Sequence, residues 1–368
     1  MKQGWEIKKL EELAIKLLAG GDKPKVFSEH PTDTLKTPVY ANGVSLDGLV
    51  GYTDKAVVNK ESITISARGT IGFCCVRKTP FVPIVRLITV IPNENIKTEF
   101  LYYALSNATI ENNGVAIPQL TIPMIKGISI PVPPREEQER IVAELDCLSG
   151  VIEKKKQQLK ELDALAQSIF YQMFGDIDEV VPLSVYIEGL SAGKSLAGDE
   201  ECSNKVLKTG AVTYDVFDAT QVKNLPLEYA PMPSHKVNAK DVLISRMNTA
   251  ELVGACAYVW EIDDNIYLPD RLWRAEIKDN SVPIYLWKAI TSNKAKEQIR
   301  SYASGTSGSM KNISKPSLMK VLIPNAPLSL QQEFAEKIEA IEKQKELIKQ
   351  SIAQTEELFN SRMDYYFN

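Results

Sequence analysis

The sequence has few histidines, scattered cysteines and no long hydrophobic run. His30 and His235 are its only histidines, and neither lies in a recognisable catalytic context. The five cysteines form no Cys-x-x-Cys pair, which argues against a zinc ribbon and a disulfide framework. No stretch of about 18 apolar residues occurs, and the first residues are too rich in charge for a signal peptide. We therefore expect a reduced, cytoplasmic protein.

Motifs that bind nucleotides or catalytic metals are also missing. The sequence contains no P-loop, no Gly-x-Gly-x-x-Gly after a strand and no His-Glu-x-x-His. A methyltransferase would need a glycine-rich cofactor loop and an acidic residue after the next strand, and neither is evident. We expect no catalytic residue, no metal site and no cofactor in this chain.

The composition is that of an ordinary globular protein. Over 368 residues, 44% are hydrophobic and 24% are charged, which suits about two to three domains. The 43 Lys and Arg residues against 47 Asp and Glu residues give a net charge of −4. This excludes a small histone-like DNA coat protein, because binding to phosphates regardless of sequence requires excess positive charge. It still allows sequence-specific binding, which concentrates a few basic residues on one face.

The chain consists of two copies of one module. Displacing the sequence by 193 residues aligns it with itself without a gap from Pro123 to the C-terminus. Further upstream the match is looser, and the offset falls to 179 where Ile65 meets Ile244. We predict two related modules, roughly residues 1–175 and 176–368, each with a variable front part and a regular back part.

The back part of each module is predicted to be a long helix. Apolar residues recur from Ile141 at spacings of three and four, a heptad pattern interrupted at Lys155. The second copy repeats this pattern, with interruptions at Lys345, Thr355 and Arg362. A helix of about 40 residues is about 60 Å long and exceeds the diameter of such a domain, so its apolar seam requires another helix. We expect the two copies to pair antiparallel, as modules related by a pseudo-twofold axis do.

The front parts are predicted to be α+β, because short apolar strands alternate there with glycine and proline. The expected fold is two globular α+β domains joined by two long helices that form an antiparallel coiled coil, with a pseudo-twofold internal repeat. The predicted boundaries are 1–134 and 176–327 for the globular domains, and 135–175 and 328–368 for the helices.

Several strings together resemble a known family. The most specific is Pro-Pro-x-Glu-Glu-Gln-x-x-Ile, which begins at Pro133 and leads into the first long helix. With the segments Trp5–Leu10, Gly20–Pro24 and Ser66–Gly72, it resembles the specificity (S) subunits of type I restriction-modification systems. The resemblance covers essentially the whole chain, twice. The second copy departs from the pattern, since Arg-Met-Asn-Thr from Arg246 replaces the Arg-Gly-Thr turn.

The resemblance implies a non-catalytic subunit that supplies DNA sequence specificity. Each front part would be a target-recognition domain for one half of a bipartite, asymmetric site in double-stranded DNA, and the helices would fix the gap between the halves. Two modification (methyltransferase) subunits would bind S-adenosylmethionine and methylate adenine. Restriction subunits, where the system has them, would use ATP and magnesium for translocation and cleavage. No membrane partner is implied.

Candidate DNA-contacting residues are loop side chains that suit base edges or phosphates. Arg68 and Arg246 are the strongest, because they stand at matching places just after a predicted strand. The candidates of the first copy are Lys23, Lys25, Tyr40, Asn42, Arg68 and Thr70. Those of the second copy are Lys194, Lys208, Tyr214, Arg246, Asn248, Thr249, Ser307 and Lys311.

Two alternative functions stay open. The first is a self-contained metal-dependent nuclease, since Asp270, Glu276 and Lys278 weakly match a Pro-Asp…Glu-x-Lys pattern. The matching stretch of the first copy, Pro83–Leu87, lacks the acids. The second alternative is a coiled-coil scaffold that binds other proteins and has no role on DNA.

Overall fold

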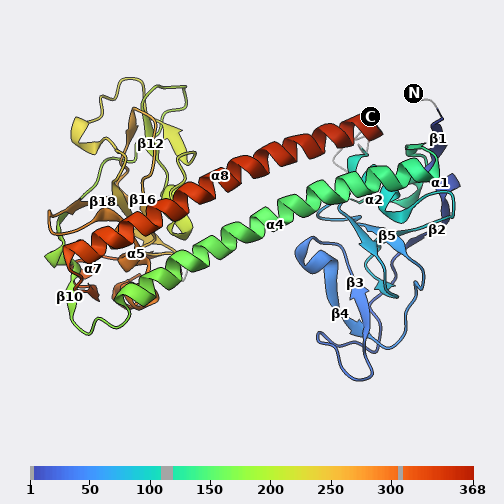
Figure 1. Ribbon diagram of the computed structural model, residues 1–368, viewed down its shortest axis with the longest axis horizontal. Coiled ribbons are helices and arrows are strands. Elements are labelled where there is room, and N and C mark those ends of the chain that lie inside the picture. The colour runs from blue at the N-terminus through green and yellow to red at the C-terminus, as the bar shows by residue number, and fades with distance from the viewer. Residues whose placement is uncertain (1–3, 109–118, 306–309) are drawn as a thin grey trace. The chain divides into compact units, whose positions relative to one another are not determined.

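The chain folds into two compact units that share both long helices. The structure, a computed structural model, describes residues 4–108, 119–305 and 310–368. The first unit comprises Met1–Lys156 and Lys349–Asn368, and the second comprises Gln157–Ile348. Each unit therefore contains one α+β part and about half of each long helix (Figure 1).

The first unit is built on a four-stranded antiparallel sheet in the order β2-β8-β5-β6. A three-stranded sheet, β4-β3-β7, and a short pair, β1-β9, complete the unit. The strands are β1 (Glu6–Lys9), β2 (Ala14–Ala19), β3 (Thr37–Tyr40), β4 (Leu49–Thr53), β5 (Ser62–Ile65), β6 (Cys74–Arg77), β7 (Val82–Pro83), β8 (Ile88–Pro92) and β9 (Ser129–Val132). The shorter helices are α1 (Leu10–Leu13), α2 (Thr98–Asn107) and α3 (Ile122–Ile125).

The second unit repeats this topology. Its four-stranded sheet has the order β11-β18-β14-β16, its three-stranded sheet β13-β12-β17, and its short pair is β10-β20. An added pair, β15-β19, has no counterpart among the described strands of the first unit. The strands are β10 (Val180–Pro182), β11 (Ile187–Ser191), β12 (Lys205–Leu207), β13 (Val222–Asn224), β14 (Val242–Ser245), β15 (Met247–Asn248), β16 (Cys256–Tyr258), β17 (Ile266–Tyr267), β18 (Leu272–Ile277), β19 (Lys311–Asn312) and β20 (Leu322–Pro324). The shorter helices are α5 (Pro283–Thr291), α6 (Asn293–Tyr302) and α7 (Lys315–Leu318).

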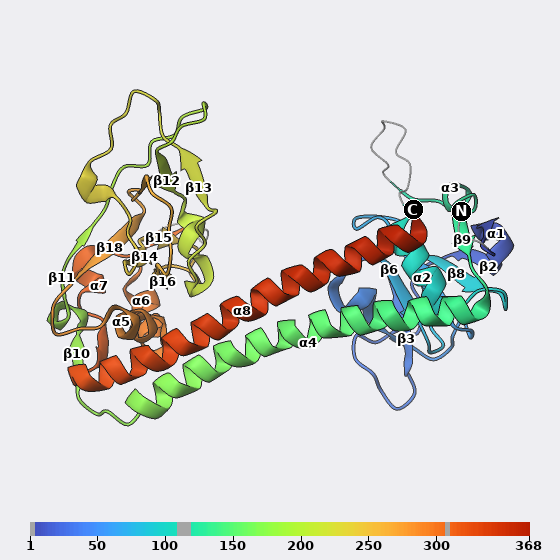
Figure 2. The same ribbon diagram turned by 45° about the horizontal axis from the view of Figure 1, so that its top comes forward.

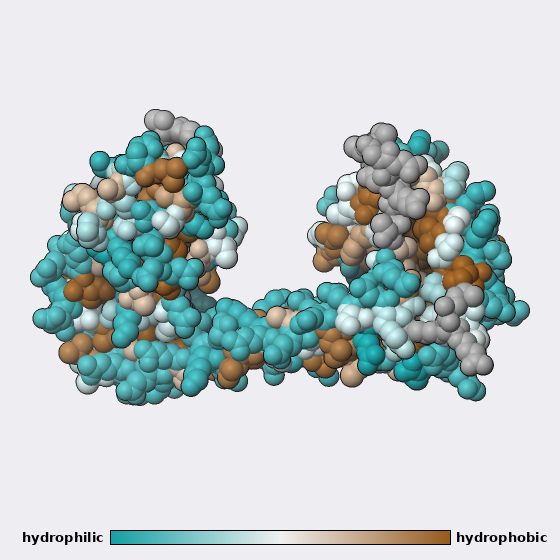
Figure 3. Space-filling view, turned by 90° about the horizontal axis from the view of Figure 1, so that it is seen from above, coloured by the Kyte–Doolittle hydropathy of each residue, from teal (hydrophilic) through white to brown (hydrophobic). Residues whose placement is uncertain are grey.

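Two unbroken helices of 40 residues each, α4 (Arg135–Phe174) and α8 (Leu328–Phe367), follow the α+β parts. In the first unit the end of α8 packs on the start of α4 and on α2 (Figure 2). The ring centres of Phe367 and Phe100 lie 5.3 Å apart there. In the second unit the end of α4 packs on the start of α8, and the ring centres of Phe174 and Phe334 lie 5.2 Å apart. Both packing patterns are antiparallel, which confirms the predicted helix pairing. On the face seen in Figure 3, the long helices are mostly hydrophilic.

Polar contacts between the helices explain the interruptions of the heptad pattern. Lys155 Nζ donates to the hydroxyl groups of Ser351 and Thr355. The buried Lys345 ammonium contacts Asp163 at 2.6 Å and Glu342 at 2.8 Å. Burial lowers the pKa of Lys345, but the two carboxylates outweigh this effect and the net pKa is raised. Such pairs fix the register of a helix pair, because a shifted register would leave the charges unpaired.

The glutamine of the Pro-Pro-x-Glu-Glu-Gln motif has a structural role in both copies. Gln138 is buried, accepts a bond from the Lys97 backbone nitrogen (2.8 Å) and donates to the Pro133 carbonyl (3.0 Å). Gln331 makes the same bridge, from the Val282 nitrogen (2.9 Å) to the Ala326 carbonyl (2.8 Å). The motif therefore ties the start of each long helix to the start of α2 or α5.

Within the described residues, no helix combines the length and the apolar character that crossing a membrane requires.

Candidate nucleic-acid interface

Strand register aligns the two units residue by residue near the ends of their central strands. In the first unit β5 pairs with β8 so that Ile65 faces Ile88. In the second, β14 pairs with β18 so that Ile244 faces Trp273. Ile65 and Ile244 also match in the sequence repeat, so their partners Ile88 and Trp273 are equivalent. Arg86 stands two residues before Ile88, and Arg271 stands two residues before Trp273. The two arginines therefore occupy equivalent positions.

The same register corrects the predicted match between Arg68 and Arg246. The backbone nitrogen of Leu120 donates to the Ala67 carbonyl (2.8 Å), and that of Ile313 donates to the Arg246 carbonyl (3.1 Å). Arg246 is therefore equivalent to Ala67, one position before Arg68. The prediction was wrong by one residue, because the offset of 179 that pairs Ile65 with Ile244 also pairs Ala67 with Arg246, and the backbone hydrogen bonds agree with this offset.

The two arginine side chains nevertheless reach equivalent partners. Arg68 donates to Gln119 Oε1 from Nε (3.1 Å) and Nη2 (2.6 Å). Arg246 Nε donates to Asn312 Oδ1 (3.2 Å). Gln119 directly precedes Leu120 and Asn312 directly precedes Ile313, so both amides lie at one place in the repeat. We call Arg68, Arg86 and Gln119 the first arginine–amide cluster, and Arg246, Arg271 and Asn312 the second.

Among the described residues, no carboxylate forms an ion pair with the arginines of these clusters. Arg86 Nη1 also donates to Gln119 Oε1 (3.3 Å), so two guanidinium groups share one neutral oxygen. An uncompensated, planar guanidinium suits a phosphate or the O6/N7 edge of guanine.

A basic cavity adjoins Arg271 in the second unit. It has a volume of about 300 Å³ and is lined by Lys208, Lys223 and Arg271, together with Ser195, Leu207, Thr209 and Pro269. The lining contains three cationic side chains and no carboxylate. Lys194, which is exposed, directly precedes Ser195. The structure thus brings Lys208, Lys223 and Arg271 together in a place suited to a phosphate group, and it does not place Lys194 in the lining.

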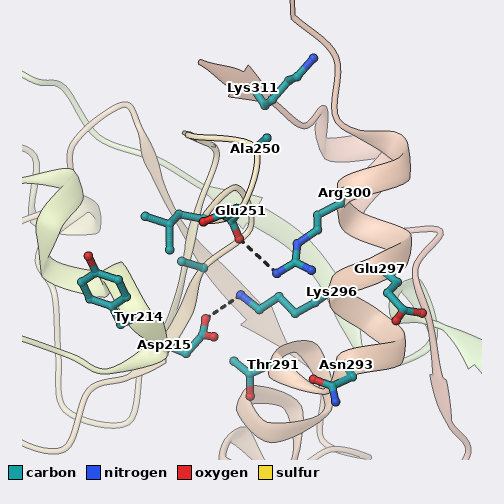
Figure 4. A pocket seen from close by; sticks show the side chains of 12 residues that line it. Tyr214, Asp215, Ala250, Glu251, Thr291, Asn293, Lys296, Glu297, Arg300 and Lys311 are labelled. Atoms are coloured by element: carbon teal, nitrogen blue, oxygen red, sulfur yellow. Dashed lines mark hydrogen bonds and ion pairs between the residues drawn. The ribbon is translucent and has the colours of Figure 1, made fainter. Parts of the chain in front are cut away.

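A larger cavity of about 850 Å³ brings together Tyr214 and Lys311 (Figure 4). Its wall holds the ion pair of Lys296 with Asp215, at 2.6 Å. Figure 4 shows Tyr214 on the side opposite α6, the helix that carries Lys296 and Arg300. Lys311 also pairs with Asn248 across β15-β19. The residue after Lys311 is Asn312, which belongs to the second arginine–amide cluster.

Among the remaining candidates of the first unit, Asn42 and Tyr40 contact other residues of the protein, and three side chains are exposed. Both ends of the Asn42 amide are engaged, since its nitrogen donates to the Val85 carbonyl (2.7 Å) and its oxygen accepts from the Ala67 nitrogen (2.6 Å). The half-buried Tyr40 ring packs against Phe81 and under the Arg77 guanidinium. The exposed candidates are Lys23, Lys25 and Thr70, and of these the Lys23 ammonium lies 3.6 Å from the centre of the Phe27 ring.

In the second unit, Thr249 is exposed beside Asn248, whose side-chain oxygen accepts the Thr249 backbone nitrogen at 2.8 Å. Ser307 lies outside the described residues.

Sequence reasoning missed Arg86, Arg271, Lys223 and the two amides. A signal for the arginines was present, because an Arg-Leu pair stands at the beginning of the equivalent strands β8 and β18 in both copies. The amides carried no such signal, since glutamine and asparagine differ in length and lie far along the chain from the arginines they contact.

The structure separates the residues of the weak nuclease pattern. Asp270 and Glu276 are six residues apart along the extended segment that includes β18, a distance of roughly 20 Å. Lys278 Nζ donates to the Ser184 carbonyl (2.8 Å). The two carboxylates therefore cannot share one metal ion, and this arrangement argues against the nuclease alternative. In the described residues no group of three or more His, Cys, Asp or Glu side chains is placed to hold a metal.

Comparisons with known proteins point to one family. A family model described as the type I restriction modification DNA specificity domain matches residues 2–164. A putative type I specificity subunit of Mycoplasma pneumoniae is 33% identical over 177 residues, which is 48% of this chain and 46% of that protein. A second M. pneumoniae sequence, named as the C-terminus of a putative type I specificity subunit, is 39% identical over 97 residues, or 26% of this chain and 67% of that sequence.

The chain thus spans about half the length of the first of these relatives. Among solved structures, the S subunit of a type I restriction-modification system from M. genitalium has a TM-score of 0.61 with 15% sequence identity, and the match covers 100% of this chain and 98% of that one. At this identity the likeness is one of fold, and it agrees with two α+β domains joined by long helices.

Proposed function

We propose that this chain, which belongs to the family of type I restriction-modification specificity subunits, reads a bipartite DNA site and leaves the chemistry to other subunits. The α+β part of each unit contacts one half of the site. The observation that carries this proposal is the repeated arginine–amide pairing: Arg68 and Arg86 donate to the neutral Gln119 amide in the first unit, and Arg246 donates to the Asn312 amide in the second.

The clusters suit direct readout. A guanidinium whose orientation is fixed by an amide loses little side-chain entropy when it meets guanine or a phosphate. Lys208 and Lys223 line the basic cavity beside Arg271, and in this proposal they contact the DNA backbone. A local surface of this kind is compatible with the net charge of −4, because readout depends on the field at the site and not on the total charge.

The partners follow from the family. Double-stranded DNA and two modification subunits form the methylating complex, and restriction subunits join it in a system that also cleaves. S-adenosylmethionine would be held by the modification subunits, and ATP and magnesium by the restriction subunits. The chain acts in the cytoplasm. The helices α4 and α8 set the distance between the two half-sites.

The proposal is tested with single arginine variants of the complex with its modification subunits. Once the methylated motif is mapped, binding is measured on the intact duplex and on duplexes with either half scrambled. Arg86→Ala should weaken discrimination at one half, and Arg271→Ala at the other, each by roughly 10- to 100-fold for a lost bidentate contact.

Arg135→Ala is the matched control, since Arg135 is an exposed arginine on α4 paired with Glu139. If both cluster variants discriminate as well as this control does, the clusters do not read DNA.

A further inference from the structure

The two units share a second repeated feature, a left-handed turn with an exposed apolar side chain. In the first unit it lies between β3 and β4, where Leu46 and Asp47 have φ of 48° and 54°. In the second it lies between the equivalent strands β12 and β13, where Tyr214 and Asp215 have φ of 64° and 63°. In both copies a hydroxyl residue precedes the apolar residue and an aspartate follows it.

Leucine and tyrosine disfavour the left-handed region, so the surrounding structure must hold each turn in this conformation. In the second unit Asp215 is the anchor. Its carboxylate accepts bonds from Lys296 Nζ (2.6 Å) and the Cys256 nitrogen (2.9 Å), and its carbonyl accepts from Trp287 Nε1 (3.1 Å). In the first unit the buried Arg77 guanidinium donates to the carbonyl of Asp47.

Anchoring the aspartate turns the preceding side chain outward. Leu46 and Tyr214 are each 77% exposed, an unusual state for large apolar side chains in a rigid turn. A monomer gains nothing from this exposure, since burial of either side chain would stabilise the fold. The same arrangement in both copies indicates a shared role for the exposed side chain.

Each turn is linked to an arginine–amide cluster through neighbouring residues. Asn42, four residues before Leu46, is hydrogen-bonded to Ala67 and Val85, the neighbours of Arg68 and Arg86. Tyr214 lines the same cavity as Lys311 (Figure 4). The residue after Lys311 is Asn312, the partner of Arg246.

We propose that Leu46 and Tyr214 are wedge residues, which pack against bases of their respective half-sites and unstack a base step there. The inference rests on the proposed function and deepens it. Leucine offers no hydrogen bond, so the first wedge reads how easily a step deforms, while the tyrosine ring also stacks on a base. A turn held in advance presents each side chain with little loss of entropy on binding.

The test uses the complex with its modification subunits and duplexes that carry 2-aminopurine, whose fluorescence rises when it is unstacked. The probe is placed singly at each purine of the mapped motif except the methylated adenine. Glycine suits a positive φ, so Tyr214→Gly and Leu46→Gly remove the side chain and relieve the backbone. The folded unit should then be as stable as before or more stable.

Tyr214→Gly should abolish the fluorescence rise in one half-site and weaken binding roughly 10- to 100-fold. Leu46→Gly should do the same for the other half-site, with a smaller loss of affinity. The controls are Leu227→Ala and Val57→Ala, since these side chains are 60% and 64% exposed and lie outside the turns.

The outcomes separate this inference from the proposed function. If the unaltered complex neither binds nor methylates the motif, the proposed function fails and the inference with it. If the complex is active but the glycine variants keep the fluorescence rise, the inference alone fails. It also fails if the variants lose the modification subunits on gel filtration, because the side chains would then bind protein and not DNA.

Discussion

Replacing the side-chain amide of Gln119 by a carboxylate tests whether the first arginine–amide cluster binds DNA through positive charge that no carboxylate compensates. Gln119 Oε1 accepts bonds of 2.6 and 3.1 Å from Arg68 and one of 3.3 Å from Arg86. Gln119→Glu places a carboxylate at the same point, so the charge of the cluster falls from two positive charges to one. All side chains that could touch DNA remain in place.

The magnitude follows from counterion release. Each phosphate neutralised by the protein contributes about 0.9 to the slope of log K against log salt. Losing one such contact should lower the slope by about 0.9 and weaken binding about eightfold at about 0.1 M salt. Folding stability should change by less than about 1 kcal/mol, because exposed ion pairs contribute little. Asn312→Asp should have the same effect through the second cluster.

The assay is fluorescence anisotropy of labelled duplex titrated with the complex at several salt concentrations. Gln332→Glu is the control, since it adds the same charge at an exposed position near the start of α8. An unchanged slope for Gln119→Glu, or an equal change for the control, would refute the idea that these arginines act as uncompensated charges.

Three further predictions concern the fold and the excluded chemistry. At about pH 8 iodoacetamide should modify the exposed Cys147 and spare Cys74, because burial raises the pKa of Cys74 to about 12 and keeps it a thiol; peptide mass spectrometry that finds Cys74 labelled in the folded protein contradicts this. Phe334→Ala should lower the free energy of unfolding in urea by about 3–5 kcal/mol, since the ring is fully buried 5.2 Å from Phe174, whereas Leu347→Ala, at a side chain 59% exposed, should change it little. With magnesium and duplex DNA the purified chain should cut nothing, and cleavage that disappears in Glu276→Ala would restore the nuclease alternative.

The long helices and the repeat could be predicted from the sequence because their signals are periodic. A heptad pattern from Ile141 fixes both the element and its apolar face, and it needs no knowledge of distant residues. The interruptions at Lys155 and Lys345 were visible, but their cross-helix partners were not, since the pairing depends on the register that the two helices adopt.

The candidate interface was less predictable because it depends on contacts between distant segments. The equivalence of Arg86 with Arg271 follows only from strand pairing. No sequence rule places Leu46 and Tyr214 at positive φ, because both residues prefer other regions. The surrounding contacts of Asp47 and Asp215 impose that conformation.

The central claim is that the chain reads two half-sites with two related units. Sequencing that detects methylated adenine, applied to DNA from cells that express this chain with its modification subunits, tests it most directly. The account predicts one motif with two specified parts separated by a constant unspecified gap. A single uninterrupted motif, or the same methylation pattern when the chain is left out, would contradict it.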